Sequence, residues 1–548
     1  MKKIYKTIKS LLLAGLILSV SSCSDELTTN SSTAIDSEIL STTAGLNMVL
    51  TSAYHYFLMN GDQGGTSQNE ACYAGIPGYC MYYDLGGADI VSIINYGGSV
   101  VNSYRFDPER TQVGGSYAGK IWTTMYKTIN QVNIIMDALP DASGDDALKT
   151  KIKGQCLAMR GICYFHLIMN YQQTYAIAKN KRGVILRLTS ADNENKGFST
   201  VQECYNQIIS DLTSAKTLLA NYDRDEMWRI NADVVSGELA RVYQVMGDWT
   251  NALTEAQTVY QKHQALMTKT EWKSGFSNLI SDGCSELVWG IKYTNLSNIS
   301  SNTEFNYWYN QDPSYGEGMT DGPTYSFINL FVDEKYVSLF DDSDYRGSKV
   351  TKTSNITDND EKGSMFWHRT NNGSTEITTK WAYNKFKYYG DANGAKQGHS
   401  YPEFPLMRSS EMLLTMAEAK ANLSKTAEAL TDLTKLQAAR EVGVKTTTSS
   451  KDELLEAIYT ERRKELLGEG VTGMYDLLRL QKPLYRYGTT AGHYSWGLSY
   501  LDDYNASDAI PHGSLPSNDY RFICQIPQME LANNSAISEK DQNPFSGQ

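Results

Sequence analysis

The amino-acid sequence predicts a mainly α-helical protein. Apolar residues recur at spacings of three and four over long stretches, which is typical of helices with one buried face. We expect this helical scaffold mainly in residues 42–58, 119–265 and 408–480. The intervening stretches are rich in Gly, Asn, Ser and Tyr and lack sustained periodicity, mainly in residues 60–118, 268–400 and 481–520. The scaffold should therefore carry large, loop-rich segments.

A paired helical unit lies in the middle of the chain. Residues 235–246 carry one apolar stripe, and residues 252–260 carry a second stripe of mainly small side chains, which allow close helix contact. Gly and Asp at 247–248 mark the break between the two helices. This is the pattern of a tetratricopeptide-like hairpin, although its ~34-residue period is not repeated cleanly. A similar hairpin spans residues 412–436, and a charged helix follows at 452–467.

The first 22 residues have the features of a secretory signal. Four lysines precede an unbroken small and apolar run from Leu11 to Val20. This run is about half of the ~20 residues that a helix needs to span a bilayer, so we expect it to be removed. The two serines before Cys23 resemble a bacterial lipobox, in which the cysteine is lipidated and becomes the first residue. Ordinary cleavage near an incidental cysteine is the alternative. Residues 23–41 are expected to form a flexible polar tether.

The chain is acidic. Its formal net charge is −12, and removal of residues 1–22 with their four lysines makes it −16. An acidic body argues against nucleic acid, anionic lipid surfaces or sulfated polyanions as principal ligands, and favours neutral or weakly charged ones. No later segment approaches a transmembrane length, so we expect membrane attachment through the lipid alone.

Cysteine and histidine spacings indicate no metal centre. The sequence contains neither a C-x-x-C pair nor an H-E-x-x-H motif, so we predict no structural transition metal, and a structural Ca²⁺ is not indicated. Seven cysteines remain after lipidation of Cys23, an odd number that cannot form a fully paired framework. Cys72 and Cys80 flank a Gly-rich loop and either pair or stay reduced, while Cys156 and Cys163 are expected as buried thiols on a helix.

Tyrosine is the dominant aromatic residue, with 37 Tyr against 14 Phe and 9 Trp. A sugar site needs aromatic faces to cover the C–H side of the ring and polar groups to pair with its hydroxyls. Two loop-rich regions supply both kinds of side chain. The first region contains Tyr73, Tyr79, Tyr82, Tyr83, Asp84, Asp89, Asn95 and Tyr96. The second contains Tyr293, Asn295, Asn306, Tyr307, Trp308, Tyr309 and Tyr315. A half-buried packing role is the alternative for each.

Several ordered motifs resemble the SusD/RagB family of nutrient-binding outer-membrane lipoproteins, over nearly the whole chain. Two segments resemble its early tetratricopeptide helices, namely Trp122, Tyr126, Ile129 and Asn133, and then Ala158, Arg160, Tyr164, Phe165 and Leu167. Later segments resemble its charged helices, namely Arg408, Glu411, Leu414, Ala417, Glu418 and Ala419, and then Ile458, Glu461, Arg462, Glu465, Leu466, Glu469, Gly470, Asp476, Leu477 and Arg479. The ending, with Ile526, Pro527, Gln528, Glu530, Asn543 and Pro544, resembles the family's closing segment.

This resemblance implies a single SusD-like body over residues 42–548. About four tetratricopeptide-like repeats would pack against an irregular half that carries the ligand site and minor β hairpins. It also implies a non-catalytic protein without a cofactor that captures oligosaccharide or polysaccharide for a SusC-like TonB-dependent transporter. Ser24, Asp25 and Glu26 resemble the short acidic signal that directs such lipoproteins to the exterior face of the outer membrane, and a plain solvated tether is the alternative.

Two other functions are compatible with the sequence. A peptide-binding member of the same family is one, and a surface glycoside hydrolase is the other. Acidic groups for hydrolysis are available at residues 341–344 and 502–503, but such carboxylates are defined by their separation in space, and surface-loop carboxylates are far commoner. The charged motif residues Arg408, Glu411, Glu461, Arg462 and Glu465 have the spacing of helix ion pairs, and we interpret them as scaffold.

Overall fold

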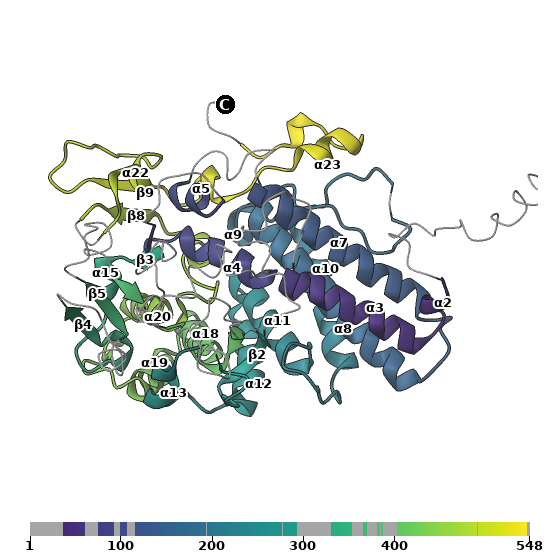
Figure 1. The fold of residues 1–548 in the computed structure, drawn as a ribbon, viewed down its shortest axis with the longest axis horizontal. Helices are drawn as coiled ribbons and strands as arrows, with labels where there is room; N and C mark the ends of the chain where they lie inside the picture. Colours follow the sequence, from purple (N-terminus) through teal and green to yellow (C-terminus); the bar gives the residue numbers. More distant parts are fainter. Residues whose placement is uncertain are drawn as a thin grey trace, which may run out of the picture.

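The computed structural model describes residues 37–60, 75–92, 99–106, 116–192, 194–276, 278–292, 330–352, 365–369, 381–383, 385–386, 403–489 and 492–544. In these residues the fold is mainly helical, as the sequence predicts (Figure 1). The longer helices are α3 (Thr43–His55), α4 (Ile76–Leu85), α7 (Ser116–Ala138), α8 (Asp146–Tyr171), α10 (Val201–Leu218), α11 (Ala232–Met246), α12 (Trp249–Lys262), α18 (Ser409–Asn422), α19 (Thr426–Ala439) and α20 (Lys451–Leu466).

Shorter helices and 3-10 or π turns connect these elements. They are α2 (Ser37–Leu40), η1 (Tyr56–Asn60), α5 (Ser99–Arg105), α9 (Tyr175–Ala178), α13 (Lys269–Ser274), α15 (Glu334–Val337), η4 (Tyr345–Gly347), α21 (Met474–Arg479), α22 (Ser495–Leu498), η5 (Tyr520–Phe522), α23 (Gln528–Asn533) and η6 (Glu539–Asp541).

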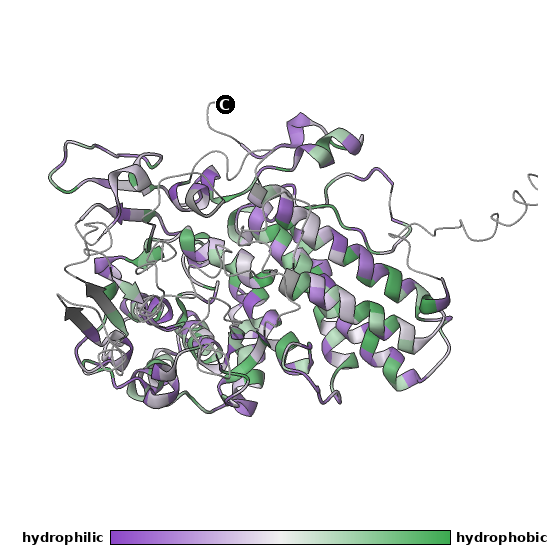
Figure 2. Ribbon diagram, viewed as in Figure 1, coloured by the Kyte–Doolittle hydropathy of each residue, from purple (hydrophilic) through white to green (hydrophobic). Residues whose placement is uncertain are grey.

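The long helices begin where the sequence supplies caps. The carboxylate of Asp145 accepts from the backbone N–H groups at the start of α8, and Thr200 with Glu203 forms a capping box on α10. The α11–α12 hairpin is confirmed, since Gly247 ends α11 with a φ of 73° and Asp248 caps α12. Figure 2 shows hydrophilic and hydrophobic bands alternating along these helices, as expected when one face of each is buried.

The strands form short sheets. Strand β1 (Ile90–Ser92) pairs antiparallel with β3 (Leu330–Val332), and β2 (Leu287–Lys292) with β7 (Glu403–Arg408). The strands β4 (Lys349–Lys352), β5 (Phe366–Arg369) and β6 (Ala382–Tyr383) form one sheet, and β8 (Leu484–Tyr487) pairs with β9 (His512–Leu515). These pairings join segments that are far apart in the sequence. The sheets with β3, β4, β5, β8 and β9 lie on the opposite side of the molecule from the α3–α7–α8–α10 bundle, and β2 lies between them beside α11 and α12 (Figure 1).

One part of the predicted irregular region is helical. Residues 60–118 were expected to lack regular structure, yet they contain α4 and α5. All ten residues of α4 are buried, so the helix has no polar face and no amphipathic period to detect in the sequence. Pro77 occupies its first turn, where a missing N–H costs nothing. Because every side of α4 is buried, its sequence has no helical periodicity, and periodicity therefore did not predict this helix.

The cysteines are mostly buried thiols. Cys156 and Cys163 lie buried on α8, as expected. Cys80 is a free, buried thiol on α4, while Cys72 lies outside the described residues. The described part of the fold therefore owes its stability to packing and polar contacts, in agreement with the cysteine count.

A cluster of buried charges joins the helical scaffold to the sheet-bearing part. Glu465 on α20 accepts hydrogen bonds from three guanidinium groups, those of Arg346, Arg408 and Arg440, at N–O distances of 2.8–3.0 Å. Among the described residues the cluster contains five cations and five anions, each at most 5% exposed: Arg346, Lys385, Arg408, Arg440 and Lys464 with Glu286, Asp344, Glu461, Glu465 and Glu469. Opposite charges therefore balance within the core.

The structural role expected for the charged motif residues agrees with this cluster, but the contacts differ from those expected. Arg408 and Glu465 pair across elements rather than along one helix. Glu411 pairs with Arg241 of α11, and Arg462 pairs with Asp476 of α21. Burial raises the pKa of the Glu465 carboxyl, but the neighbouring arginines outweigh this effect and hold the pKa well below its usual range.

The shared carboxylate at Glu465 makes a testable prediction. Glu465→Gln leaves three buried guanidinium groups without their common anion, so we expect a loss of about 3–5 kcal/mol in the free energy of unfolding, measured by urea denaturation. Glu428→Gln on the exposed face of α19 is the matched control and should change the value by less than about 0.5 kcal/mol. Equal effects of the two substitutions would contradict the role of the cluster.

Candidate functional site

The sequence-predicted ligand residues fall into two groups in the structure. Cys23, Tyr73, Asn95, Tyr96, Tyr293, Asn295, Asn306, Tyr307, Trp308, Tyr309 and Tyr315 lie outside the described residues. Tyr79, Tyr82, Tyr83, Asp84 and Asp89 lie within them, and each is at most 4% exposed. The five residues of the second group are therefore buried in the described part of the structure.

Four of these side chains hold α4 in the core. The Tyr79 hydroxyl hydrogen-bonds to Thr124 Oγ1 at 2.7 Å, and the Tyr83 hydroxyl accepts from Asn170 Nδ2 at 2.7 Å. The ring of Tyr82 lies 4.2 Å from that of Tyr117, centroid to centroid. Asp84 accepts from Thr472 Oγ1 at 2.6 Å and from the Gly470 N–H at 3.1 Å. These contacts give the four residues packing roles, the alternative that the sequence left open.

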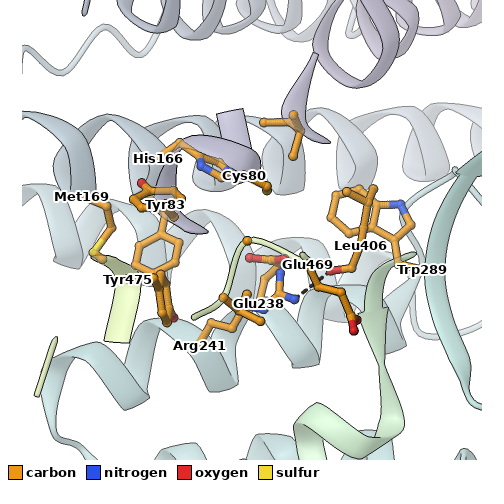
Figure 3. Close-up of a pocket in the computed structure, with 14 residues that line it drawn as sticks. Cys80, Tyr83, His166, Met169, Glu238, Arg241, Trp289, Leu406, Glu469 and Tyr475 are labelled. Atoms are coloured by element: carbon orange, nitrogen blue, oxygen red, sulfur yellow. Dashed lines mark hydrogen bonds and ion pairs between the residues drawn. The ribbon is translucent and has the colours of Figure 1, made fainter. Parts of the chain in front are cut away.

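A small, partly open cavity lies beside Tyr83, between α4, α8 and α11 (Figure 3). Its volume is about 30 Å³, which is the room of about one water molecule. On one wall Arg241 donates to Glu238 and to the carbonyl of Leu406, both at 2.7 Å. Burial, with a contribution from Arg241, lowers the pKa of His166 to about 4. A cavity of this size belongs to the packing of the core and cannot hold a sugar ring.

The strand pair β1–β3 joins two residues that border, in the sequence, the regions with the predicted ligand residues. Ser92, the last residue of β1, is paired with Leu330, the first residue of β3. Residues 93–98, with Asn95 and Tyr96, follow the first strand, and residues 293–329 precede the second. Ser92 and Leu330 therefore lie side by side, although they are 238 positions apart in the chain.

An open cleft of about 270 Å³ lies at the other end of this strand pair. Asp89 directly precedes β1 and Asp333 directly follows β3, and both line the cleft. The other lining residues come from α15, α20, α21, β8 and nearby turns, and they are Gly87, Ala88, Lys335, Leu339, Tyr459, Arg463, Gly473, Leu477, Pro483, Leu484, Tyr485, Arg486, Tyr487 and His493. The cleft therefore combines aromatic faces with charged and polar groups.

Two aromatic residues of the cleft share one face of β8. Side chains alternate along a strand, so Tyr485 and Tyr487 point away from the buried residues Leu484 and Arg486. Tyr485 is 53% exposed, and the ammonium of Lys335 lies 3.0 Å from the centroid of the Tyr487 ring. Sequence reasoning missed this pair, although the alternation in Leu-Tyr-Arg-Tyr is a period-two signal that could have found it.

The acidic groups of the cleft are engaged in structural contacts. Both carboxylate oxygens of Asp89 accept from the guanidinium of Arg463, with an Nε–Oδ2 distance of 2.9 Å. Burial lowers the pKa of Arg463, but the pairing with Asp89 outweighs it and raises the pKa overall. Asp333 caps α15 by accepting from the Lys335 N–H at 2.7 Å. Neither carboxylate has the arrangement of a free general acid or base.

Of the five other acidic residues that the sequence offered for hydrolysis, Asp342 is exposed and the other four make structural contacts. Asp341 accepts from the backbone N–H groups of Ser343 and Gly443, and Asp344 is part of the buried cluster. Asp502 pairs with Arg521 at 2.9 Å, and Asp503 accepts from Ser514 at 2.9 Å. In the described part of the chain no group of three His, Cys, Asp or Glu side chains is placed to hold a metal ion.

None of the described helices is long and apolar enough to cross a membrane.

Two family models match the chain, and both belong to one family. The model of the SusD family matches residues 285–545, and the model described as starch-binding associating with outer membrane, a SusD-like model, matches residues 94–244. The chain belongs to the SusD family. This is a carbohydrate-binding family whose description associates it with the outer membrane.

Individual relatives agree with this SusD-family assignment. A SusD-like protein of Formosa agariphila is 24% identical over 399 residues, which cover 66% of this chain and 72% of the relative. A SusD-like carbohydrate-binding protein of Bacteroides vulgatus has a solved structure with a TM-score of 0.71 and 26% identity, and the match covers 92% of this chain and 99% of that one. A laminarin-binding SusD-like protein shares the fold, with a TM-score of 0.61 and 19% identity over 91% of this chain and 98% of its own.

The burial of Asp84 leads to a prediction about pH. Burial raises its pKa from 3.8 to about 7, so between about pH 4 and 7 the folded state binds a proton that the unfolded state lacks. The stability contributed by this group is therefore present at low pH and lost as pH rises through 7.

We expect Asp84→Asn to gain stability relative to the wild type between pH 5 and pH 8, by roughly 1.4 kcal/mol for each pH unit between pH 5 and the pKa of about 7. Urea denaturation at the two pH values measures this difference. Asp342→Asn, which removes an exposed carboxylate, is the control. A difference between Asp84→Asn and the wild type that is the same at both pH values would contradict the prediction.

Proposed function

We propose that this chain is a cell-surface lipoprotein that captures oligosaccharide or polysaccharide and passes it to a SusC-like TonB-dependent transporter. The observation that carries the proposal is the pairing of Ser92 with Leu330. In the sequence these two residues border regions rich in Tyr, Trp and Asn, and the tyrosine-lined cleft lies at the far end of the same strands. Membership of the SusD family supports the carbohydrate as the ligand class.

The chemistry of the cleft suits a sugar. The exposed ring of Tyr485 offers a flat face for the C–H side of a sugar ring, and the guanidinium of Arg463 offers donors for hydroxyl groups. The strands between cleft and loop anchors are three residues long, about 10 Å at ~3.3 Å per residue. A single oligosaccharide of a few units is therefore long enough to extend from the cleft to the paired ends at Ser92 and Leu330.

We propose binding without cleavage. Asp89 and Asp333 are held by Arg463 and by the start of α15, so the cleft lacks a carboxylate pair available for acid and base chemistry. Peptide binding is the alternative within the family, and a glycoside hydrolase is the less favoured one. Release of product from a bound oligosaccharide would overturn the non-enzymatic proposal, and binding to peptides in place of glycans would overturn the carbohydrate proposal.

We also propose that lipid on Cys23 anchors the body to the outer face of the outer membrane. Helix α2 begins at Ser37, within the stretch 23–41 that the sequence suggested as a tether, so we propose residues 23–36 as the tether. They contain few large apolar side chains, as a tether requires. A tether of this length keeps the binding body beside a membrane-embedded partner at high effective concentration. A binding protein attached by lipid alone can thereby serve import through the transporter.

The cleft is tested by glycan binding to the purified chain. A glycan array that includes starch and laminarin fragments identifies a ligand, and calorimetry then compares variants. We expect Tyr485→Ala to weaken binding roughly 2- to 10-fold, because one aromatic face is lost. Tyr500→Ala is the matched control, since Tyr500 is 40% exposed and does not line the cleft. Equal affinities of the wild type and Tyr485→Ala would exclude the cleft from the site.

The loop-borne part of the site has a separate test. Trp308 is the largest aromatic side chain in the second region, so Trp308→Ala should weaken glycan binding by a similar factor. Unchanged affinity of this variant would remove residues 293–329 from the proposed site and leave the cleft as its remaining part.

The anchor is tested by Cys23→Ala. We expect this variant to appear in the soluble fraction of cells while its affinity for the identified glycan stays unchanged, because the anchor and the binding body are separate parts of the chain. Fractionation followed by calorimetry measures both properties. Retention of the variant in the membrane fraction would argue against lipidation at Cys23, and loss of binding would contradict the separation of the two roles.

A further inference from the structure

A second open cleft lies where the segment 518–544 packs against the end of α8. Its volume is about 440 Å³, within the usual range for sites that bind small molecules. It is lined by Gln172, Gln173, Lys181, Arg182, Asn518, Tyr520, Ile523, Lys540, Asp541, Gln542, Asn543 and Pro544. None of these residues lines the cleft beside β8, so the two clefts are separate.

The guanidinium of Arg182 is the central feature of this C-terminal cleft. It donates to the carbonyl of Gly183 at 3.0 Å and to Oδ1 of Asn543, and the ring of Phe198 covers one face at 4.7 Å. Arginine has five N–H donors, so three of them donate to no described residue. Arg408 in the core, by contrast, contacts three carboxylates. Arg182 has no ion pair with any carboxylate of the described chain.

The other charges around the cleft add to this unpaired cation. Lys181 and Lys540 line the cleft, are exposed, and form no ion pair with the described residues. Asp541 is the one acidic side chain of the lining, and it accepts from the N–H and the hydroxyl of Ser538. Burial lowers the pKa of Arg182 to about 10, against a smaller opposite effect of Asp541. The cleft is therefore locally positive on a chain with a net charge of −12.

Two amide oxygens in the lining also lack protein partners. Oε1 of Gln173 and Oδ1 of Asn518 are buried and accept no hydrogen bond from the described residues. The other end of the Gln173 amide is held in place, because its Nε2 donates to the carbonyls of Asn518 and Asp519 at 3.1 and 3.0 Å. Unsatisfied acceptors beside an unpaired guanidinium match a ligand that carries hydroxyl donors together with a negative charge.

We propose that the C-terminal cleft binds a saccharide unit that carries a carboxylate, a uronic acid. The carboxylate accepts from the free N–H groups of Arg182, which present a planar fork of matching geometry. Lys181 and Lys540 add attraction at the rim, and the hydroxyl groups of the sugar ring donate to the amide oxygens of Gln173 and Asn518. The proposal stands on these residues alone and does not depend on the cleft beside β8.

The positive charges that line the C-terminal cleft favour a uronic acid over a neutral sugar. The negative net charge of the chain disfavours a long polyanion, since distant acidic groups repel it. A single carboxylate at the cleft meets mainly the three nearby cations, because charges more than about 10 Å away are screened at 0.1 M salt. A uronic acid is therefore favoured over both a neutral hexose and a heavily sulfated chain.

Calorimetry with the purified full-length chain tests the proposal. The probes are D-glucuronate, D-galacturonate, D-glucose and inorganic phosphate. We expect at least one uronate to bind, with glucose at least about tenfold weaker, because a hydrogen bond to a charged group contributes roughly 1.5–3 kcal/mol. Arg182→Gln should lose at least about tenfold in affinity for the uronate. Glucose or phosphate binding as tightly as both uronates would overturn the proposal.

Arg182 also contacts Asn543, so Arg182→Gln could lose affinity through a folding defect. A second variant separates the two effects. The double variant K181A/K540A removes two exposed side chains without ion pairs, and it should weaken uronate binding roughly 2- to 10-fold with an unchanged unfolding midpoint. Lys445→Ala, another exposed lysine outside the cleft, is the matched control and should leave the affinity unchanged. Equal uronate affinity of K181A/K540A and the wild type would overturn the role of the positive rim.

Discussion

The fold depends on one shared contact, the carboxylate of Glu465 held by three buried arginines. Arg346 comes from the turn before β4, Arg408 from the junction of β7 and α18, and Arg440 from the end of α19. Each of these segments belongs to a different part of the chain, so a single anion on α20 sets their mutual positions. Buried charges are costly unless they are paired, and removal of one member leaves the others uncompensated. The cluster therefore specifies one arrangement of scaffold and sheet.

The same helix connects this cluster to the cleft beside β8. Glu461 and Glu465 lie one turn apart on α20 and face the buried arginines. Tyr459 and Arg463 each lie two positions earlier, which on a helix of 3.6 residues per turn is a rotation of about 200° and therefore nearly the opposite face. One face of α20 forms ion pairs with the buried arginines, and on the other face Arg463 pairs with Asp89. The position of the cleft thus follows from the interior contact.

Periodicity predicted most of the scaffold and little of the site. The α11–α12 hairpin was found because one face of each helix is buried and Gly247 separates them. Helix α4 was missed because all of its faces are buried. Its tyrosines were grouped with the ligand candidates because the region was expected to be loop-rich. Aromatic composition marks both a packed core and a recognition surface, so Tyr83 and Tyr485 are alike in sequence and differ only in exposure. The cleft itself joins residues 87–89, 333–339, 459–463 and 473–493, which no local pattern links.

The sequence by itself determined the mainly helical class, the helical hairpin, the family resemblance and the cysteine usage, because each depends on local spacing or on ordered motifs. The tertiary structure decided which charges meet, which tyrosines are buried and where the two clefts lie. Ser92 and Leu330 become neighbours, and Arg182 meets Asn543, through strand pairing and chain closure over more than 200 residues. Such contacts depend on the folded path of the whole chain, and for that reason the Glu465 cluster was visible in the sequence only as helix-spaced charges.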